Sequence, residues 1–369
     1  MKILGIVCEY NPFHTGHAYQ IQKAREESGA DIIVCAMSGP LVQRGDLAII
    51  DKWERAKCAV LWGADVVFEL PALFALRAAP DFAYGAVSLL KSAGASCLSF
   101  GCETDSKDKI MEFAALSPDM KDALKKGQSY PRAFAESSVF DMDTVNAPNL
   151  VLASEYLKAS QALGGMELYP IKRTNAHLEG AGAIRKRLLS GEALDDSFDI
   201  PACTYDALSG GIYNSSENIS QAALFKLRNM PPSDMALCLG VSEGLENRIY
   251  ECAQKATSLS ELFSMIKTKR YTMARIRRAV LSCVLDMTYE LAGNYPAPPY
   301  LRLLAFNAKT AGRYLRQLSD DSPLPVISKL ADANLNECLS LDIYAQSLFD
   351  LGINKNAQRD YLTSPVIIK

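Results

Sequence analysis

The sequence has no uninterrupted apolar run long enough to cross a membrane. Its most apolar stretch, residues 56–79, is broken by Asp65, Glu69 and Arg77, whereas a spanning helix needs roughly 18 to 20 apolar residues in succession. The first residues pass from a short apolar run directly into polar ones and lack the cleavage-site pattern of a signal peptide. We therefore expect no membrane span and interpret the N-terminus as a first strand.

A large charge of one sign and paired cysteines are also lacking. The chain carries 39 Lys plus Arg against 42 Asp plus Glu, for a net charge of -3. This balance excludes a uniformly basic nucleic-acid coat but allows a local basic patch. The ten cysteines are scattered, and none lies in a C-x-x-C pair. That pattern argues against a disulfide framework or a zinc site and favours reduced core cysteines in a cytoplasmic protein.

What remains is the composition of a folded protein of about two domains. The chain has 369 residues, 49% hydrophobic and 22% charged, and domains average roughly 150 residues. In the first half, short β-branched runs alternate with helical patterns that end at glycines. The expected strands are Lys2–Cys8, Asp31–Met37, Asp65–Leu70, Cys97–Phe100 and Glu167–Ile171. The expected helices are His17–Glu27, Asp51–Trp62 and Asp81–Ser92.

This alternation predicts an α/β fold with a Rossmann-like, doubly wound parallel sheet, in which ligands bind at the carboxyl ends of the strands. We place a first, catalytic domain at residues 1–195. Residues 196–369 are expected to form a second, mostly helical domain, because residues 221–351 have mainly helical patterns punctuated by prolines. Residues 106–146 show helical pieces without a strong strand, and the sequence suggests no role for them.

The segment EYNPFHTGH, residues 9–17, is the most informative part of the chain. It lies where the first strand ends and the first helix begins, and it contains two of the three histidines. A helix N-terminus offers unpaired N–H groups and a partial positive charge, so it binds anions. His14 and His17 can donate to phosphate oxygens there, and Gly16 leaves room for a nucleotide to approach the backbone. We therefore expect a triphosphate at this site.

Two simpler interpretations of these histidines stay open. His14 and His17 could be a turn residue and a helix cap without further function. Metal ligation by H-x-x-H alone is less well supported, because no third ligand lies close in sequence; we expect no bound metal of the protein's own. A Walker loop and a G-x-G-x-x-G motif are both absent after the first strand, so a nucleotide would need a different site.

The motif NPFHTGH resembles the first signature of the HIGH-type nucleotidyltransferases. An ordered series of further matches narrows the resemblance to the tRNA(Met) cytidine acetate ligase family, over nearly the whole chain. The matching segments are residues 38–39, 42–45, 63–65, 69–71, 100–103, 148–149, 155–158, 170–173 and 183–185. A lone H-x-x-H would be a weak signal, whereas the ordered series is strong.

The resemblance implies a two-step reaction. Acetate would attack the α-phosphate of ATP, with Mg²⁺ expected to accompany the nucleotide, to give acetyl-adenylate and pyrophosphate. The N4 amine of the wobble cytidine of elongator tRNA(Met) would then take the acetyl group and release AMP. By matching position, the catalytic residues would be His14 and His17, and the ATP-binding residues Val7, Asn11, Gly16, Gly101, Asn149 and Arg173.

The chain departs from the family's pattern in one important place. Relatives usually carry hydroxyl residues before the last A-I-R, in a loop that closes on pyrophosphate, but this chain has Gly180 and Gly182 there. Glycine keeps the backbone N–H donors and loses the hydroxyls, which puts the rate of the reaction in question. His177, just before this loop, could reach the phosphates or could be a solvated loop residue.

A basic run, residues 267–278, holds six positive charges and Tyr271 without a carboxylate. Such a concentration favours phosphate contacts with RNA over a solvated helix face, although the latter stays possible. The expected RNA-binding residues are Lys269, Arg270, Arg275, Arg277 and Arg278.

Two functions compete with the ligase. One is a small-molecule adenylyltransferase, which would have no need for a basic helical domain. The other is a tRNA-binding protein with decayed catalysis, marked by the two glycines. Asp65 and Glu69 could orient Mg²⁺ or a neighbouring arginine, but we expect them to be buried and paired with the arginine-bearing loop 42–45, and we do not assign them to the site.

Overall fold

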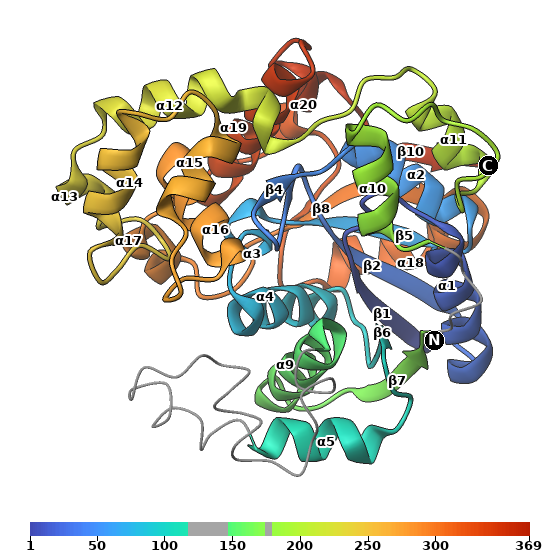
Figure 1. Ribbon diagram of the computed structural model, residues 1–369. Helices are drawn as coiled ribbons and strands as arrows, with labels where there is room; N and C mark the ends of the chain where they lie inside the picture. Colours follow the sequence, from blue (N-terminus) through green and yellow to red (C-terminus); the bar gives the residue numbers. More distant parts are fainter. Residues whose placement is uncertain (117–146, 174–178) are drawn as a thin grey trace.

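A computed structural model describes residues 1–116, 147–173 and 179–369. Its main feature is an eight-stranded sheet with the order β10-β8-β5-β2-β1-β6-β7, in which β9 also pairs with β8 (Figure 1). The strands of the first half are β1 (Ile3–Cys8), β2 (Ile32–Ser38), β5 (Val66–Leu70), β6 (Cys97–Cys102) and β7 (Glu167–Lys172). All neighbours among these five strands are parallel, as the alternating pattern predicts.

The two faces of the sheet are covered by different helices because alternate side chains of each strand point to opposite faces. In β1, Ile3 and Val7 join a core that includes α4 and α9, whereas Leu4 and Ile6 join a core that includes α1 and α2. The helices up to residue 208 are α1 (Thr15–Ser28), α2 (Lys52–Leu61), α3 (Ala72–Ala75), α4 (Ala79–Ser92), α5 (Lys107–Leu116), α9 (Pro148–Ala162), α10 (Ala181–Leu189) and α11 (Ala202–Leu208). A short hairpin, β3 (Leu41–Val42) and β4 (Asp46–Leu47), follows β2.

The second half is mainly helical, and many of its helices form a group beside the β3–β4 hairpin (Figure 1). Its helices are α12 (Ser220–Asn229), α13 (Pro232–Met235), α14 (Leu245–Ala253), α15 (Leu259–Ile266), α16 (Met273–Val284), α17 (Tyr289–Asn294), α18 (Ala308–Asp321), α19 (Glu337–Gly352) and α20 (Arg359–Leu362). Short 3-10 turns occur at Ser216–Ile219 and Leu330–Asp332. No helix among the described residues has the length and apolar character that a membrane span requires.

The sequence patterns missed three strands of the second half. They are β8 (Leu301–Asn307), β9 (Val326–Ile327) and β10 (Val366–Ile368). Strand β8 is antiparallel to β5, so the sheet is mixed and mostly parallel. The main sheet therefore takes strands from both sides of the boundary near residue 195, which itself stays a prediction.

A buried group of charges fastens β8 to the rest of the sheet. Lys52 binds Glu69 at 2.9 Å and Asp360 at 2.8 Å, and Arg302 binds Asp360 at 2.8 Å and Glu69 at 3.4 Å. We call these four residues the ion cluster. Burial of Glu69 was predicted correctly, but its expected pairing with loop 42–45 was wrong, because Arg302 lies directly opposite Glu69 on the antiparallel strand.

Asp65 departs from the expectation in the same way. It is buried, and its carboxylate binds Arg25 of α1 at 2.5 Å and accepts from the Ile33 N–H at 2.7 Å. Its other carboxylate oxygen accepts from the Thr310 hydroxyl of α18. These partners belong to a neighbouring strand and two helices rather than to loop 42–45.

Candidate active site

A cavity of about 270 Å³ opens at the carboxyl ends of β1, β6 and β7. This edge of the sheet is where a doubly wound fold binds its ligands. Every residue assigned from the sequence to catalysis or ATP binding lines the cavity: Val7, Asn11, His14, Gly16, His17, Gly101, Asn149 and Arg173. The structure thus brings the eight positions together, and their roles stay predictions.

The two histidines form a reciprocal cap on α1. His14 Nδ1 accepts from the Gly16 N–H at 3.0 Å, and His17 Nδ1 accepts from the His14 N–H at 3.2 Å. Their rings lie 3.8 Å apart at 35°. Both histidines therefore cap the helix through Nδ1, as the simpler interpretation expected for a helix cap. Both also line the cavity.

The cap has a chemical consequence for the other ring nitrogen. A neutral imidazole that accepts at Nδ1 carries its proton on Nε2 and donates from there. Burial, followed by the charges of His14 and Arg173, holds the pKa of His17 well below its ordinary value of 6.5. His17 is therefore neutral at physiological pH, and its Nε2–H can donate to an anion.

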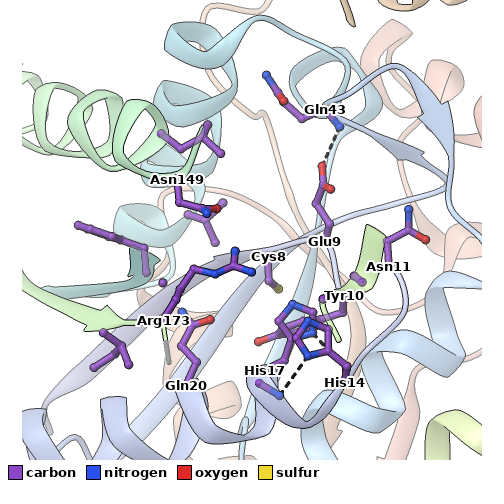
Figure 2. A pocket seen from close by; sticks show the side chains of 18 of the residues that line it. Cys8, Glu9, Tyr10, Asn11, His14, His17, Gln20, Gln43, Asn149 and Arg173 are labelled. Carbon is purple, nitrogen blue, oxygen red and sulfur yellow. Dashed lines mark hydrogen bonds between the residues drawn. The ribbon is translucent and has the colours of Figure 1, made fainter. Parts of the chain in front are cut away.

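The residues before the cap turn the chain sharply at the end of β1. Tyr10 has a φ of 48°, in the left-handed region, so the side chains of Glu9 and Asn11 leave the turn in different directions (Figure 2). The Asn11 Oδ1 accepts from the Ile49 N–H at 2.7 Å. Asn11 thus lines the cavity while its amide oxygen holds a neighbouring loop.

The opposite wall is formed by the ends of β6 and β7 and the start of α9. Asn149 Nδ2 donates to Glu103 Oε1 at 2.7 Å, which fixes the amide at the cavity edge. A Cβ added to Gly101 would meet no atom closer than 3.7 Å. The neighbouring residues would therefore leave room for a side chain at position 101. A glycine there is better explained by a ligand that lies against the backbone than by packing within the chain.

The N-terminus of α10 completes the cavity, and Gly180, one of the two glycines that replace the expected hydroxyl residues, lines it. Gly180 precedes the helix and has no side-chain cap. Arg185 of the same helix donates to the Asn11 carbonyl, and burial lowers its pKa below the ordinary value. His177 lies outside the described residues, so its expected place in the loop is not described.

The described residues contain no group of three or more His, Cys, Asp or Glu side chains arranged to hold a metal ion. Mg²⁺ usually keeps several waters and binds through substrate phosphates with one or two carboxylates. A metal carried by the nucleotide therefore needs no dedicated group of protein ligands here.

The basic run lies directly behind the cavity wall. Arg277 binds Asp46 at 3.1 Å, and Arg278 Nη1 donates to the Gln43 carbonyl at 3.0 Å. Both contacts join α16 to the β3–β4 hairpin, and Gln43 and Arg44 of that hairpin line the cavity. The five residues expected to bind RNA thus divide into two that also hold the hairpin and three beyond it.

Those three lie toward the N-terminal end of the run. Arg275 and Arg270 approach Glu243 at 3.8 and 3.2 Å, and Lys269 is exposed. Their function in RNA binding stays a prediction.

Sequence reasoning left several lining residues out of the site. Glu9, Gln43, Arg44, Tyr156 and Arg185 all line the cavity. Gln43, Arg44, Tyr156 and Arg185 lie within segments that carry the family resemblance, and Glu9 lies two residues before the first of them, so the signal was present. Without strand order and the position of the hairpin, however, nothing in the sequence shows which side chains face one cavity.

Known proteins match the chain over its whole length. A family model described as HIGH Nucleotidyl Transferase matches residues 1–363. The tRNA(Met) cytidine acetate ligase of Lysinibacillus sphaericus is 33% identical, with 99% of this chain and 100% of the relative covered. That of Alkaliphilus metalliredigens is 34% identical, with 99% and 98% covered. The chain belongs to the tRNA(Met) cytidine acetate ligase family.

Solved structures agree with this membership. The crystal structure of Thermotoga maritima TmcAL bound with alpha-thio ATP has a TM-score of 0.90 and 28% identity, with 100% of both chains covered. The apo form of the same protein has a TM-score of 0.89 and 27% identity, also with full coverage. The predicted family and the α/β fold class are thereby confirmed.

Proposed function

We propose that this chain is an ATP-dependent ligase of the cytoplasm that activates acetate as acetyl-adenylate. The acetyl group then passes to N4 of the wobble cytidine of elongator tRNA(Met). The observation that carries this proposal is the pair of imidazoles at the N-terminus of α1, in a chain whose relatives over its full length are named tRNA(Met) cytidine acetate ligase. All ten cysteines are free, which suits a reducing compartment.

In the first step, the chain's contribution is to bind the triphosphate and stabilise the charge that develops on it. His14 and His17 donate from Nε2 at the positive end of α1, where the N–H groups of the first turn also point. Arg173 supplies a formal charge close enough to lower the pKa of His17. These donors are fixed before the reaction, so they lower the barrier without reorganising.

ATP fits the cavity by three features: the donors at α1, the space above Gly101 and the arginines on the facing wall. Mg²⁺ would arrive with the phosphates, coordinated by their oxygens and by water. Gly180 and Gly182 offer backbone N–H groups, which suits a loop that contacts the pyrophosphate through its main chain.

The test is exchange of labelled pyrophosphate into ATP by the purified protein. We expect exchange that depends on acetate, followed by incorporation of labelled acetate into tRNA(Met) when tRNA is added. Exchange that ignores acetate and needs a phosphorylated metabolite would favour the adenylyltransferase. Binding of tRNA without exchange or transfer would favour the decayed protein.

A further inference from the structure

Glu9 presents a carboxylate to the cavity that the first step does not use. It follows β1 directly, is half-buried and lines the cavity. In Figure 2 its side chain points away from His14 and His17 and toward Gln43. Among the described residues, the carboxylate makes one hydrogen bond, from the Gln43 N–H to Oε1 at 2.7 Å, and no ion pair.

The position of Glu9 is fixed by its surroundings. Arg55, which is fully buried, donates from Nη1 to the Glu9 carbonyl at 2.6 Å and to the Ser38 carbonyl at 2.9 Å. The left-handed turn at Tyr10 and the hydrogen bond from Gln43 hold the rest of the residue. Arg55 and Arg185 lie close enough for their charges to act on Glu9, but neither forms an ion pair with its carboxylate. A carboxylate held this firmly, with no ion pair among the described residues, is preorganised to accept from a ligand.

The ligand that suits it is a neutral N–H donor rather than an anion. The negative charge of the Glu9 carboxylate would repel a phosphate placed next to it. Glu9 therefore marks a side of the cavity that suits hydrogen-bond donors, apart from the phosphate side at α1. The exocyclic amine of cytosine is such a donor, and Glu or Asp accepting from cytosine N4 is a recurrent contact in base recognition.

The location agrees with entry of RNA from this side. Gln43 donates its N–H to Glu9 and accepts at its carbonyl from Arg278, so one residue joins the carboxylate to the basic run. Gly45 of the same hairpin packs so closely on α16 that an added Cβ would lie 2.6 Å from the Arg277 Cβ. A strand whose phosphates follow the basic run would thus place a base next to Glu9.

We propose that Glu9 receives the N4 amine of the target cytidine and acts as the general base of the acetyl transfer. This inference rests on the proposed function. The N4 lone pair forms a bond to the acetyl carbonyl carbon, and the bond from that carbon to the adenylate oxygen breaks, so that AMP leaves with the electron pair. The N4 proton passes to the Glu9 carboxylate, which later releases it to water.

The test separates the two steps in the variant Glu9→Gln. Glutamine keeps an oxygen that accepts from the Gln43 N–H, so the hairpin stays held, but it removes the base. We expect acetate-dependent pyrophosphate exchange within about twofold of the parent and a single-turnover acetyl transfer at saturating tRNA reduced by roughly 10²-fold or more, as for loss of a general base.

Three further measurements complete the design. Hydroxylamine traps acetyl-adenylate as acetohydroxamate without tRNA, and Glu9→Gln should form it at the parental rate. Glu9→Asp keeps a carboxylate and should recover part of the transfer. Glu27→Gln removes the same charge from an exposed position on α1 outside the cavity and should match the parent in both steps.

Two results would overturn the inference about Glu9. One is equal loss of exchange and transfer in Glu9→Gln, which would assign the carboxylate to adenylate formation. The other is transfer at the parental rate. Failure of the proposed function is distinguishable, because the parent itself would then show no acetate-dependent exchange.

Discussion

Two groups of charged and polar side chains lie close to the same sheet and differ in what their polar atoms contact. In the ion cluster, two cations and two carboxylates are buried and contact one another at 2.8 to 3.4 Å. In the cavity, the Nδ1 atoms of His14 and His17 accept from backbone N–H groups at the start of α1, and the Glu9 carboxylate accepts one hydrogen bond among the described residues.

The difference separates structural from functional polarity. Buried charges that satisfy each other hold two chain segments in register, and nothing remains for a ligand to contact. Side chains that bind the backbone through one polar atom and also face a cavity are held in a fixed orientation and can still contact a ligand. Removing a member of the first group should therefore cost stability, and removing one of the second should cost rate.

The largest effect is expected from Lys52→Met, which breaks the ion cluster. It leaves Glu69 and Asp360 with only Arg302 to neutralise them in a buried site, and we expect a loss of about 3 to 5 kcal/mol in the free energy of unfolding. Denaturant titration measures it. The control, Lys52→Met with Glu69→Met, restores charge balance and should recover much of the loss; equal instability of both variants would refute the comparison.

His17→Ala should affect rate rather than fold. It removes a donor to the phosphates, which typically raises the barrier by about 2.7 to 4 kcal/mol, and pyrophosphate exchange should fall by roughly 10²- to 10³-fold. The variant His17→Asn keeps a side-chain acceptor for the His14 N–H and should separate the cap from catalysis. A fall of less than about tenfold in both variants would leave His17 as a helix cap alone.

The stability of the protein should fall on acidification because of the same residue. Burial holds the pKa of His17 well below 6.5 in the folded state, so the unfolded chain binds a proton that the folded chain does not. Above pH 6.5 this effect does not reduce the free energy of unfolding. Each pH unit below 6.5 lowers the free energy of unfolding by up to about 1.4 kcal/mol, until the pKa of His17 in the folded state is reached. Unfolding titrations between pH 7.5 and 5 should therefore be flatter for His17→Asn than for the parent.

Much of the fold and of the candidate site could be predicted from local sequence. Strands β1, β2, β5, β6 and β7 have strong apolar runs and are followed by helices, so their order and type were readable. Strand β8 was missed because it lies between helices and pairs with β5, which is more than 200 residues away in the chain. No local pattern specifies that partner.

The site divides in the same manner. His14 and His17 could be assigned because they share one short segment at a strand-to-helix junction. Gln43 could not, since its importance lies in joining Glu9 to Arg278, residues 34 and 235 positions away. Such contacts depend on how the hairpin packs on α16, which is a tertiary property.

The smallest effect per residue is expected in the outer part of the basic run, and it tests whether that run binds RNA at all. Lys269 is exposed, and Arg270 is 60% exposed with only a surface ion pair to Glu243. Because neither residue lines the cavity or contacts the hairpin, Lys269→Ala with Arg270→Ala should leave pyrophosphate exchange unchanged. If both contact phosphates, the slope of log affinity for tRNA against log salt should flatten by about 0.7 to 0.9 for each charge removed.

The matched control is Lys329→Ala, which removes an exposed charge far along the chain from the run. Arg278→Ala gives the contrast, because it also removes the hydrogen bond to the Gln43 carbonyl. It should therefore slow acetyl transfer to tRNA by more than the loss of one phosphate contact, measured as the change in salt slope, accounts for. An unchanged slope in the double variant would make the outer run a solvated surface and would leave Arg277 and Arg278 as supports of the hairpin. A changed slope with normal exchange would instead place phosphate contacts with RNA at the segment before α16 and leave adenylate formation at α1 independent of them.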